Sequence, residues 1–461
     1  MPTLPQEMTI IDHGTGGGPE VMVPARAPLP VPKADEVLIR VMATGVNRPD
    51  VQQRSGNYPP PPGASPIMGL ECAGEVVATG ESVTRYKAGD RVCALTNGGA
   101  YAEYCAAPEA QTLPWPAGYD AMRAAYLARQ VRAMETIGRQ LAGERFDLAD
   151  EVERCFDIHV ERTPEAVFEE ALAIYDATVP GSGSLAERVE ARRRSQELPR
   201  DRTPLVLGLL TDAMAEVRRR TAAFVEMPVG ENVELATVTN QPWGAYNWYL
   251  GEARSRIELN TDLPTNLAAL LDTAAHEGYP GHHTEHALKE ARLYREQGHL
   301  ENSILLINTP ECVIAEGIAT MAAEMIFAPG EARAWTEAHI FPAAGLASDT
   351  VDAEALRQAG EMLAGVRGNA VFMLHVDGRS DDDVAAYLMR YSLLNEARAR
   401  KALEFLKSPL WRAYTFTYAY GKRLMQPLLQ GPDRLAVFSR LLTEPVYPGL
   451  LVEWGEALTP S

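Results

Sequence analysis

The spacing of apolar and polar residues changes along the chain near residue 125. Before about residue 115, short runs such as residues 37–46 (VLIRVMATGV) and 74–80 (GEVVATG) are rich in β-branched residues and are separated by Gly and Pro. Such runs are typical of strands joined by turns. From about Ala121, long segments rich in Ala, Leu, Glu and Arg have the apolar spacing of helices. We therefore predict two domains, a strand-rich one over residues 1–125 and a mainly helical one over residues 126–461.

Several elements of the second domain can be placed from local signals. Thr203 followed by Pro204 predicts an N-cap with proline at the first helical position, opening a helix that runs to about Val225. Helical spacing also marks residues 310–328, 350–375, 381–394 and 409–430. A single β-element is expected over residues 247–260 (NWYLGEARSRIELN), just before the segment that carries the candidate chemistry.

Charge and composition exclude several classes of function. The formal net charge is -19, whereas a general nucleic-acid or anionic-membrane binder needs a basic face. The sequence has no run of about 20 apolar residues, which a membrane helix requires, and its start lacks the features of a signal peptide. Five scattered cysteines without CxxC spacing indicate reduced thiols. These features predict a cytoplasmic protein without nucleic-acid or membrane partners.

The strongest candidate for chemistry is an adjacent histidine and glutamate, His276 and Glu277. Residues 267–275 carry apolar side chains at the spacing of one buried helix face, and Glu277 continues that face. A carboxylate there needs a partner, because unpaired buried acids are rare. An imidazole that binds Zn²⁺ beside a carboxylate that takes a proton from a water molecule is suited to metal-dependent hydrolysis. We therefore expect His276 as a zinc ligand and Glu277 as a general base.

The second metal ligand is His282 or His283. Histidines four residues apart share a helix face, but Pro280 occupies that position here. Proline kinks or breaks a helix, and a bulge at Pro280-Gly281 that absorbs two residues would let His282 act as the second ligand. This geometry favours His282 and leaves His283 as the alternative. His286, one turn after His282, is expected at most to orient a ligand. The competing interpretation is a histidine-rich helix end without metal.

A third ligand is expected at Glu316. It lies inside the apolar segment 310–324 (PECVIAEGIATMAAE), where a charged residue needs a counter-ion that a metal would supply. Thr320, one turn later, is a candidate for a supporting hydrogen bond. The alternative for Glu316 is a buried ion pair with Arg398 or Arg400.

The motif HEGYPGHH at residues 276–283, together with the downstream helix around Glu316-Gly317, resembles a bacterial family of unknown function. That family carries HExxPGHH and EGWALYAE-type motifs and is distantly similar to carboxypeptidase Taq and other glutamate-zincin metallopeptidases. Ile318 and Thr320 depart from its commoner Trp and Leu. The resemblance covers residues from about Ala125 to the C-terminus. It implies a helical, zincin-like scaffold that hydrolyses peptide bonds with zinc.

Further residues are assigned to substrate. In zincins a strand placed before the metal helix pairs with extended substrate, so Arg256, Glu258 and Asn260 are predicted to bind a peptide. His283 is assigned to the same substrate-binding group. A tyrosine hydroxyl, that of Tyr418 or Tyr420, is predicted to donate to the oxyanion that forms during hydrolysis.

The stretch GVNRPDVQQRSGNYPPPPGASPIMGLECAGEVVATG, in the first domain, resembles the zinc-independent quinone oxidoreductases of the medium-chain dehydrogenase/reductase superfamily. The similarity covers about residues 8–125 and implies a GroES-like β-barrel. Asn47 and Leu70 stand where zinc alcohol dehydrogenases have a Cys and a His ligand, so the resemblance implies no catalytic zinc there. It also implies that Asn47, Asp50 and Tyr58 border the nicotinamide and substrate.

The cofactor domain that follows in that superfamily is not recognisable in the sequence. The one candidate glycine fingerprint, Gly181-Ser-Gly183, is a weak signal and also fits a loop between helices. NADP is therefore not an expected cofactor. The sequence predicts a zinc-dependent hydrolase of peptide or other amide bonds. The alternatives are an NADPH-dependent quinone oxidoreductase activity of the first domain, or a non-catalytic fusion.

Overall fold

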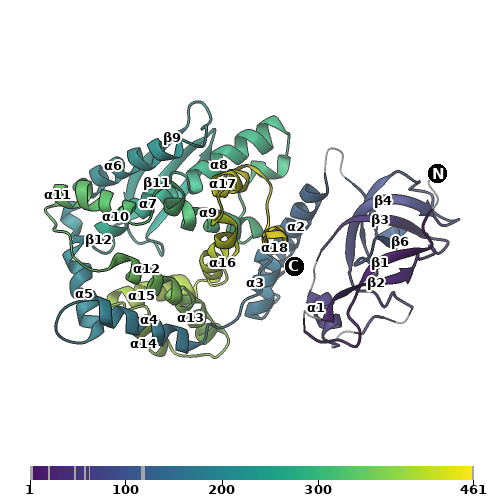
Figure 1. The fold of residues 1–461 in the computed structure, drawn as a ribbon, viewed down its shortest axis with the longest axis horizontal. Coiled ribbons are helices and arrows are strands. Elements are labelled where there is room, and N and C mark those ends of the chain that lie inside the picture. Colours follow the sequence, from purple (N-terminus) through teal and green to yellow (C-terminus); the bar gives the residue numbers. More distant parts are fainter. Residues whose placement is uncertain are drawn as a thin grey trace. The chain divides into compact units, whose positions relative to one another are not determined.

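The computed structural model describes residues 4–18, 21–45, 48–56, 59–61, 63–115 and 120–458. The chain divides into two compact units, residues 1–128 and 129–461, which are described separately (Figure 1). The helix α2 (Ala121–Leu141) contains the boundary between them.

The first unit is built around an antiparallel sheet with the strand order β6-β3-β4-β5-β7. Alternate residues of β4 are buried, among them Val76, as expected for a strand with one face on a core, whereas β3 begins with four consecutive buried residues, Glu36 to Ile39. The strands of this unit are β1 (Glu7–Asp12), β2 (Val23–Pro28), β3 (Glu36–Thr44), β4 (Glu71–Thr79), β5 (Arg91–Leu95), β6 (Tyr104–Pro108) and β7 (Thr112–Pro114); one helix, α1 (Arg48–Arg54), lies between β3 and β4. The strand-rich module is thus present as predicted, as a half-barrel where the sequence predicts a β-barrel.

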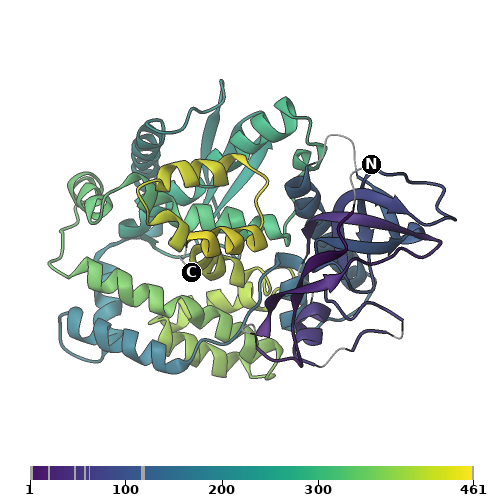
Figure 2. The same cartoon turned by 45° about the vertical axis from the view of Figure 1, so that its right-hand side comes forward.

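The second unit is largely helical, as predicted. One group of helices, α6 to α11, lies with a small sheet, and α4, α5 and α12 to α15 form another group (Figures 1 and 2). The helices are α3 (Leu148–Phe156), α4 (Glu165–Thr178), α5 (Leu185–Ser195), α6 (Thr203–Thr221), α7 (Leu270–Glu277), α8 (His282–Lys289), α9 (Pro310–Ile326), α10 (Glu331–Trp335), α11 (Phe341–Ala344), α12 (Ala353–Met362), α13 (Val366–His375), α14 (Asp381–Tyr391), α15 (Glu396–Lys407), α16 (Thr415–Met425), α17 (Arg434–Thr443) and α18 (Pro448–Leu458).

Two local predictions in this unit can be compared directly with the structure. The helix α6 begins at Thr203, but Arg202 is its N-cap and the Thr203 hydroxyl donates to the Arg200 carbonyl (2.6 Å), so Thr203 does not cap the helix as predicted. The Gly181–Gly183 stretch joins α4 to α5, and Ser184 caps α5 with a capping box. The prediction of a loop between two helices is confirmed at this point.

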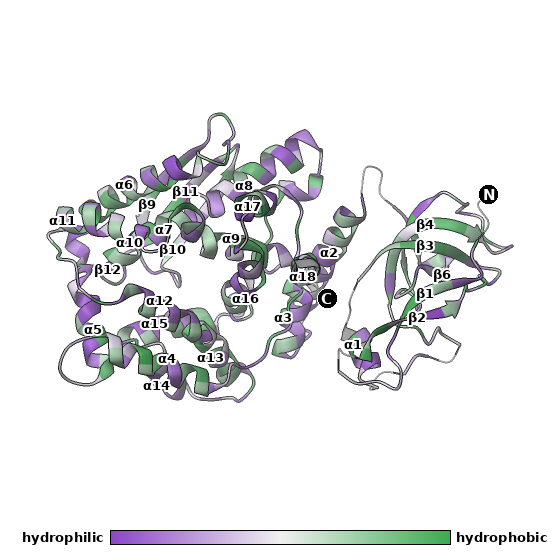
Figure 3. Ribbon diagram, viewed as in Figure 1, coloured by the Kyte–Doolittle hydropathy of each residue, from purple (hydrophilic) through white to green (hydrophobic). Residues whose placement is uncertain are grey.

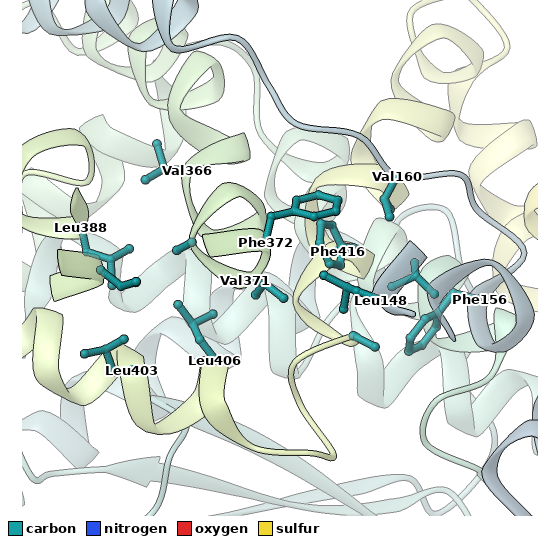
Figure 4. Close-up of a cluster of buried hydrophobic side chains, with 14 of the residues drawn as sticks. Leu148, Phe156, Val160, Val366, Val371, Phe372, Leu388, Leu403, Leu406 and Phe416 are labelled. Atoms are coloured by element: carbon teal, nitrogen blue, oxygen red, sulfur yellow. The ribbon is translucent and has the colours of Figure 1, made fainter. Parts of the chain in front are cut away.

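Burial places α9 at the centre of the second unit. Most of its side chains are buried, and it packs against α7, α8 and α16. Its apolar character contrasts with the hydrophilic surface helix α5 (Figure 3). A further core joins α3, α13, α14, α15 and α16 through residues such as Phe156, Phe372 and Phe416 (Figure 4). In the described part of the chain no single helix is long and apolar enough to span a membrane, while α9 and residues 331–344, bent by 73°, have that length and composition only as a pair.

The predicted β-element is a hairpin within a three-stranded sheet. Its strands β10 (Ala245–Gly251) and β11 (Arg254–Asn260) pair antiparallel, and β11 also pairs in parallel with β9 (Asn232–Val238), which the sequence did not predict. The order β10-β11-β9 makes β11 the central strand. The remaining strands of this unit, β8 (Glu197–Leu198) and β12 (Thr265–Asn266), form a short separate pair.

The metal-motif segment is two helices rather than one bulged helix. The helix α7 ends at Glu277, residues 278–281 form a tight connection that includes a cis Tyr279-Pro280 bond, and α8 starts at His282. Gly281 lies against the end of α7, and a Cβ on it would meet the His276 carbonyl oxygen at 1.9 Å. Only glycine fits this close backbone approach.

We expect Gly281→Ala to destabilise the protein by about 1–3 kcal/mol, because the added methyl group must displace backbone. Thermal and denaturant unfolding of the whole chain measure this change. Gly208→Ala is the matched control: Gly208 lies in α6 with open space around its Cβ position, so the substitution should be neutral or stabilising by up to about 1 kcal/mol. Equal stability of the two variants would contradict the packing argument.

Candidate metal centre and active site

Two histidines and one glutamate from three helices meet in the second unit. His276 is in the last turn of α7, His282 is the first residue of α8, and Glu316 lies in the middle of α9. One ligand atom from each lies within 4.8 Å of the others. The Nε2 of His276 is 3.4 Å from Glu316 Oε2, and the Nε2 of His282 is 3.8 Å from Glu316 Oε1. The break between α7 and α8 is what allows both rings to face one carboxylate.

The three residues line a pocket of about 700 Å³, open solvent included. Its walls come from β10, α7, α8, α9, the segment before α9, and the α15–α16 region. Aromatic rings form much of one side, and Glu277 and His286 also line it. The candidate centre is therefore reachable by a ligand and is not sealed within the core.

The electrostatics couple His276 to Glu316. Burial alone would lower the pKa of His276, but the adjacent Glu316 carboxylate and the charge of Glu277 raise it to about 9. Burial alone would raise the pKa of Glu316, whereas its contact with His276 and the hydrogen bond from Tyr414 lower it. A proton on His276 thus balances the charge of the buried Glu316 carboxylate. A metal cation at the same place would be stabilised by that carboxylate in the same way.

The remaining donors suit a metal ion. Burial lowers the pKa of His282 to about 3, so its imidazole is neutral and offers a lone pair. Glu316 Oε2 is buried without a hydrogen-bond partner of acceptable geometry among the described residues. Two imidazole nitrogens and one carboxylate oxygen match the donors of catalytic zinc sites that have three protein ligands. The residues present therefore fit a Zn²⁺ ion.

Glu277 lies beside the candidate centre with a titration range near neutrality. It is buried and lines the pocket, and burial raises its pKa to about 7 despite the opposing effect of His276. The Asn247 amide on β10 donates to the Glu277 carbonyl oxygen (2.6 Å), tying the end of α7 to the sheet. Asn247 also lines the pocket and was not predicted as a site residue.

The alternative partner assignments for Glu316 are wrong. Arg398 pairs with Glu197, and Arg400 pairs with Asp382 and Glu396. Both arginines lie on α15, and their carboxylate partners are at other sites. Glu316 contacts the two histidines and accepts a hydrogen bond from the Tyr414 hydroxyl (2.7 Å).

The strand assigned to substrate needs correction. Arg256, Glu258 and Asn260 lie on β11, which already has β10 on one side and β9 on the other, so it has no free edge for a peptide. Arg256 pairs with Glu258, and the Asn260 amide donates to two main-chain carbonyls, those of Gln241 and Trp243. The strand that borders the pocket is β10, through Ala245, Tyr246 and Asn247.

His283 is neither in the metal cluster nor in the pocket lining. It is fully buried and hydrogen-bonds with Ser255 Oγ (2.8 Å) and Glu231 Oε2 (3.1 Å). Glu231 also accepts from the Tyr279 hydroxyl and pairs with Arg218. The assignment of His283 to substrate is therefore wrong, because successive helical residues are turned by about 100° and His283 faces Ser255 and Glu231 instead of the pocket. His286 does line the pocket, with its ring stacked on that of His282 at 5.9 Å.

The two candidate tyrosines separate in the structure. Tyr418 lines the pocket, and Tyr414, four residues earlier on the same face, lines it too. Tyr420 points elsewhere, because two residues turn a helix by about 200°, and its hydroxyl accepts the Glu161 main-chain N–H (3.2 Å). The oxyanion role of Tyr420 is therefore ruled out. Tyr414 was not selected from the sequence, although its four-residue spacing from Tyr418 was a usable signal.

In the first unit, one of the residues assigned to nicotinamide and substrate can be placed. Asp50 is buried on α1 and accepts the Gly69 main-chain N–H (3.0 Å). Asn47 and Tyr58 lie outside the described residues. Leu70 directly precedes β4, and its carbonyl accepts the Thr96 N–H (2.7 Å).

Comparisons with known proteins identify the class of the first module. Residues 33–117 match the alcohol dehydrogenase GroES-like domain, which confirms the predicted N-terminal resemblance. The resemblance of the second unit to glutamate-zincins stays a prediction.

Particular relatives agree with this class. The chain is 45% identical to a pig (Sus scrofa) quinone oxidoreductase over 95 residues, which is 20% of this chain and 29% of that protein. It is 40% identical to the mouse (Mus musculus) synaptic vesicle membrane protein VAT-1 homolog-like over 103 residues, 22% and 25% of the two chains. A solved Pseudomonas syringae quinone oxidoreductase is 31% identical, with a TM-score of 0.28, over 32% of this chain and 48% of that one. The chain thus spans less than half of each of these relatives.

Proposed function

We propose that the second unit is a metal-dependent hydrolase of peptide or other amide bonds. The observation that carries this proposal is the convergence of His276, His282 and Glu316 within 4.8 Å in a pocket that Glu277 also lines. A Zn²⁺ ion held by these three residues would supply Lewis-acid chemistry, polarising a carbonyl group and making water a stronger nucleophile at neutral pH.

Glu277 is the proposed general base. Its carboxylate would accept a proton from the attacking water and return it to the amine nitrogen that leaves. A group that takes and then returns a proton works best with a pKa near the working pH. Burial raises the pKa of Glu277 to about 7, which supports this role.

The two pocket tyrosines have different proposed roles. The Tyr414 hydroxyl donates to Glu316 Oε1 and would fix the orientation of this ligand. Burial and the charges of Glu316 and Glu277 raise the pKa of Tyr418 well above its ordinary value, so its hydroxyl keeps its proton. In the pocket it would donate to the carbonyl oxygen of the substrate as negative charge develops there.

The strand β10 is the proposed guide for substrate. Among the described strands it has β11 on one side only, so its other edge can pair with an extended peptide. Three consecutive residues of β10 line the pocket, which would place such a peptide beside Glu277.

The metal site is tested by elemental analysis of the purified whole chain after incubation with Zn²⁺ and gel filtration. We expect about one zinc per chain in the unaltered protein and a loss of most of it in His276→Ala, His282→Ala and Glu316→Ala, since each removes one of three ligands. His339→Ala is the control, because this exposed histidine of the second unit lies outside the cluster. Retention of zinc by all three ligand variants would exclude the site.

The catalytic assignments are tested by kinetics on peptide substrates with zinc-loaded protein. We expect Glu277→Gln to lower kcat by roughly 10²–10⁴ while zinc content stays unchanged, because it removes a base and no ligand. Tyr418→Phe should lower kcat by about a hundredfold, as for loss of an oxyanion donor. Tyr420→Phe is the matched control and should retain activity. A reversed order for the two tyrosine variants would refute the assignment.

A second candidate function belongs to the first module. Its support is the match of residues 33–117 to the alcohol dehydrogenase GroES-like domain and the identity to quinone oxidoreductases. We propose, as this second candidate, that the module takes part in NADPH-dependent reduction of a quinone. Within the described residues the parallel strand pairing is limited to β9 and β11, so these residues do not form a Rossmann-type cofactor domain.

This second candidate requires binding of NADPH. Calorimetric titration of the whole chain with NADPH should then give a saturable heat. Addition of a quinone should oxidise the bound cofactor, which is measured as a loss of NADPH absorbance at 340 nm. Titration with NADPH of the zinc-loaded Glu277→Gln variant is the control, since that change lies in the other unit. The absence of any binding heat would remove this candidate for the isolated chain.

A further inference from the structure

We propose that the pocket of the second unit selects an uncharged peptide amide with a bulky apolar or aromatic side chain next to the scissile bond, and that it rejects a free carboxylate there. This inference rests on the proposed hydrolase function and names its substrate class.

The first support is a wall of aromatic rings that hold one another in place. Trp243 and Tyr246 on the β10 side are 5.1 Å apart between ring centroids, and each lies 6.5 Å from Trp411. Phe405 stacks on Trp411 at 5.3 Å with an interplanar angle of 16°. All four residues line the pocket. Because the rings already pack on each other, a substrate side chain meets a preformed apolar surface.

The apolar surface continues to the outside of the pocket. Leu305 and Ile307, in the segment before α9, line the pocket, and Leu305 is 47% exposed. The amide of Asn308 donates to the Leu410 carbonyl oxygen (3.1 Å), which ties this segment to the stretch that carries Trp411. The exposed apolar surface of this leucine would be removed from water when an apolar side chain binds, which favours binding.

Two polar atoms of pocket-lining residues match an amide. Trp243 Nε1 is a donor, and Asn247 Oδ1 is an acceptor. Both atoms are buried with no hydrogen-bond partner among the residues that the structure describes. A peptide group that entered between these two residues would offer an acceptor to Trp243 and a donor to Asn247, whereas a carboxylate has no N–H for Asn247.

The charges around the pocket disfavour a carboxylate. Among the described residues that line it, none is lysine or arginine, while Glu277, Glu311 and Glu316 are acidic. Lys289 reaches Glu311 Oε1 (3.3 Å) but is buried and also bonded to Glu285 Oε1 (2.6 Å). Arg367 is exposed and acts on Tyr418 through its charge without lining the pocket. The metal would serve the scissile carbonyl, and among the described residues no lining lysine or arginine would pair with a separate carboxylate, so a carboxylate beside the scissile bond would be desolvated without a side-chain counter-charge.

The test measures binding to the whole-chain Glu277→Gln variant loaded with Zn²⁺, so that peptides are not consumed. The probes are N-acetyl-phenylalanyl-leucinamide, the same peptide with a free carboxylate, and N-acetyl-glycyl-glycinamide, titrated by calorimetry and by tryptophan fluorescence. We expect the first probe to bind at least about tenfold tighter than the glycine probe, because it buries one aromatic side chain. It should also bind at least about tenfold tighter than the free-carboxylate probe, because that probe brings an unpaired charge into the pocket. Equal or reversed affinities, or no binding of any probe, would overturn the inference.

Single substitutions test whether the side chain of the first probe binds to the apolar surface of the pocket. Leu305→Asp and Ile307→Ala should each weaken binding of the first probe by roughly fivefold or more, since each removes apolar pocket surface. Leu300→Asp is the matched control, because Leu300 is 71% exposed in the same segment and outside the lining. Arg367→Ala should not change the affinity for the free-carboxylate probe. A loss of that affinity in Arg367→Ala, or equal effects of the Leu300 and Leu305 changes, would count against the proposal.

The outcomes also separate this inference from the hydrolase proposal. Selective binding of the first probe without hydrolysis by the unaltered protein would support the pocket assignment and remove the hydrolase. Hydrolysis of the glycine probe as fast as of the phenylalanine probe would keep the hydrolase and overturn the selectivity.

Discussion

The candidate site depends on one constraint, the close backbone contact between Gly281 and the end of α7. The chain leaves α7 after Glu277 and starts α8 at His282, so it has four residues in which to turn. A Cβ at residue 281 would meet the His276 carbonyl oxygen at 1.9 Å, so a side chain there would require the backbone of the ligand-bearing residue His276 to shift. The turn is also held from the side away from the pocket, where Glu231 accepts hydrogen bonds from Tyr279 and His283. The two consecutive histidines thus have different contacts: His282 faces the candidate metal centre, and His283 anchors the start of α8 through Ser255 and Glu231.

A second consequence is electrostatic. Glu316 lies in a helix most of whose side chains are buried, and an unpaired carboxylate there would be strongly unfavourable. His276, with its pKa raised to about 9, holds a proton beside it at neutral pH. Binding of a divalent cation would displace that proton, so metal affinity is expected to rise with pH as His276 releases it. The same geometry therefore stabilises the apo protein with a proton and the loaded protein with a metal.

Features defined by local sequence patterns could be predicted, whereas features that depend on pairing between distant segments could not. His276, Glu277 and Glu316 are recognisable because a charged or metal-ligating residue stands out within an apolar helical segment. The hairpin around residues 247–260 is likewise a local pattern. The parallel pairing of β9 with β11 was not predicted, because it joins segments separated by the β10 strand and has no local turn signal. That omission caused the assignment of substrate contacts to β11, which is central, in place of the edge strand β10.

The roles of neighbouring residues were the hardest to separate from sequence alone. His282 and His283, or Tyr418 and Tyr420, differ in function because of which face of a helix they occupy, and that depends on where the helix starts. The α7–α8 break resets the phase of the second helix, so an unbroken helix extrapolated from His276 could not give it. The bulge predicted at Pro280-Gly281 favoured His282, and His282 does lie in the cluster with His276 and Glu316. For Tyr420 the deciding partner is the Glu161 main chain, far away in the sequence.

The two candidate functions are chemically independent. Among the described residues, those that line the pocket lie between Trp243 and Tyr418, within the second unit. Conversely, the match to the alcohol dehydrogenase GroES-like domain ends at residue 117, before the second unit begins. Evidence for an oxidoreductase role of the first module therefore neither supports nor weakens the metal centre. Because the donors at that centre are two imidazoles and one carboxylate, its function has to be argued from its own geometry, whatever chemistry the first module performs.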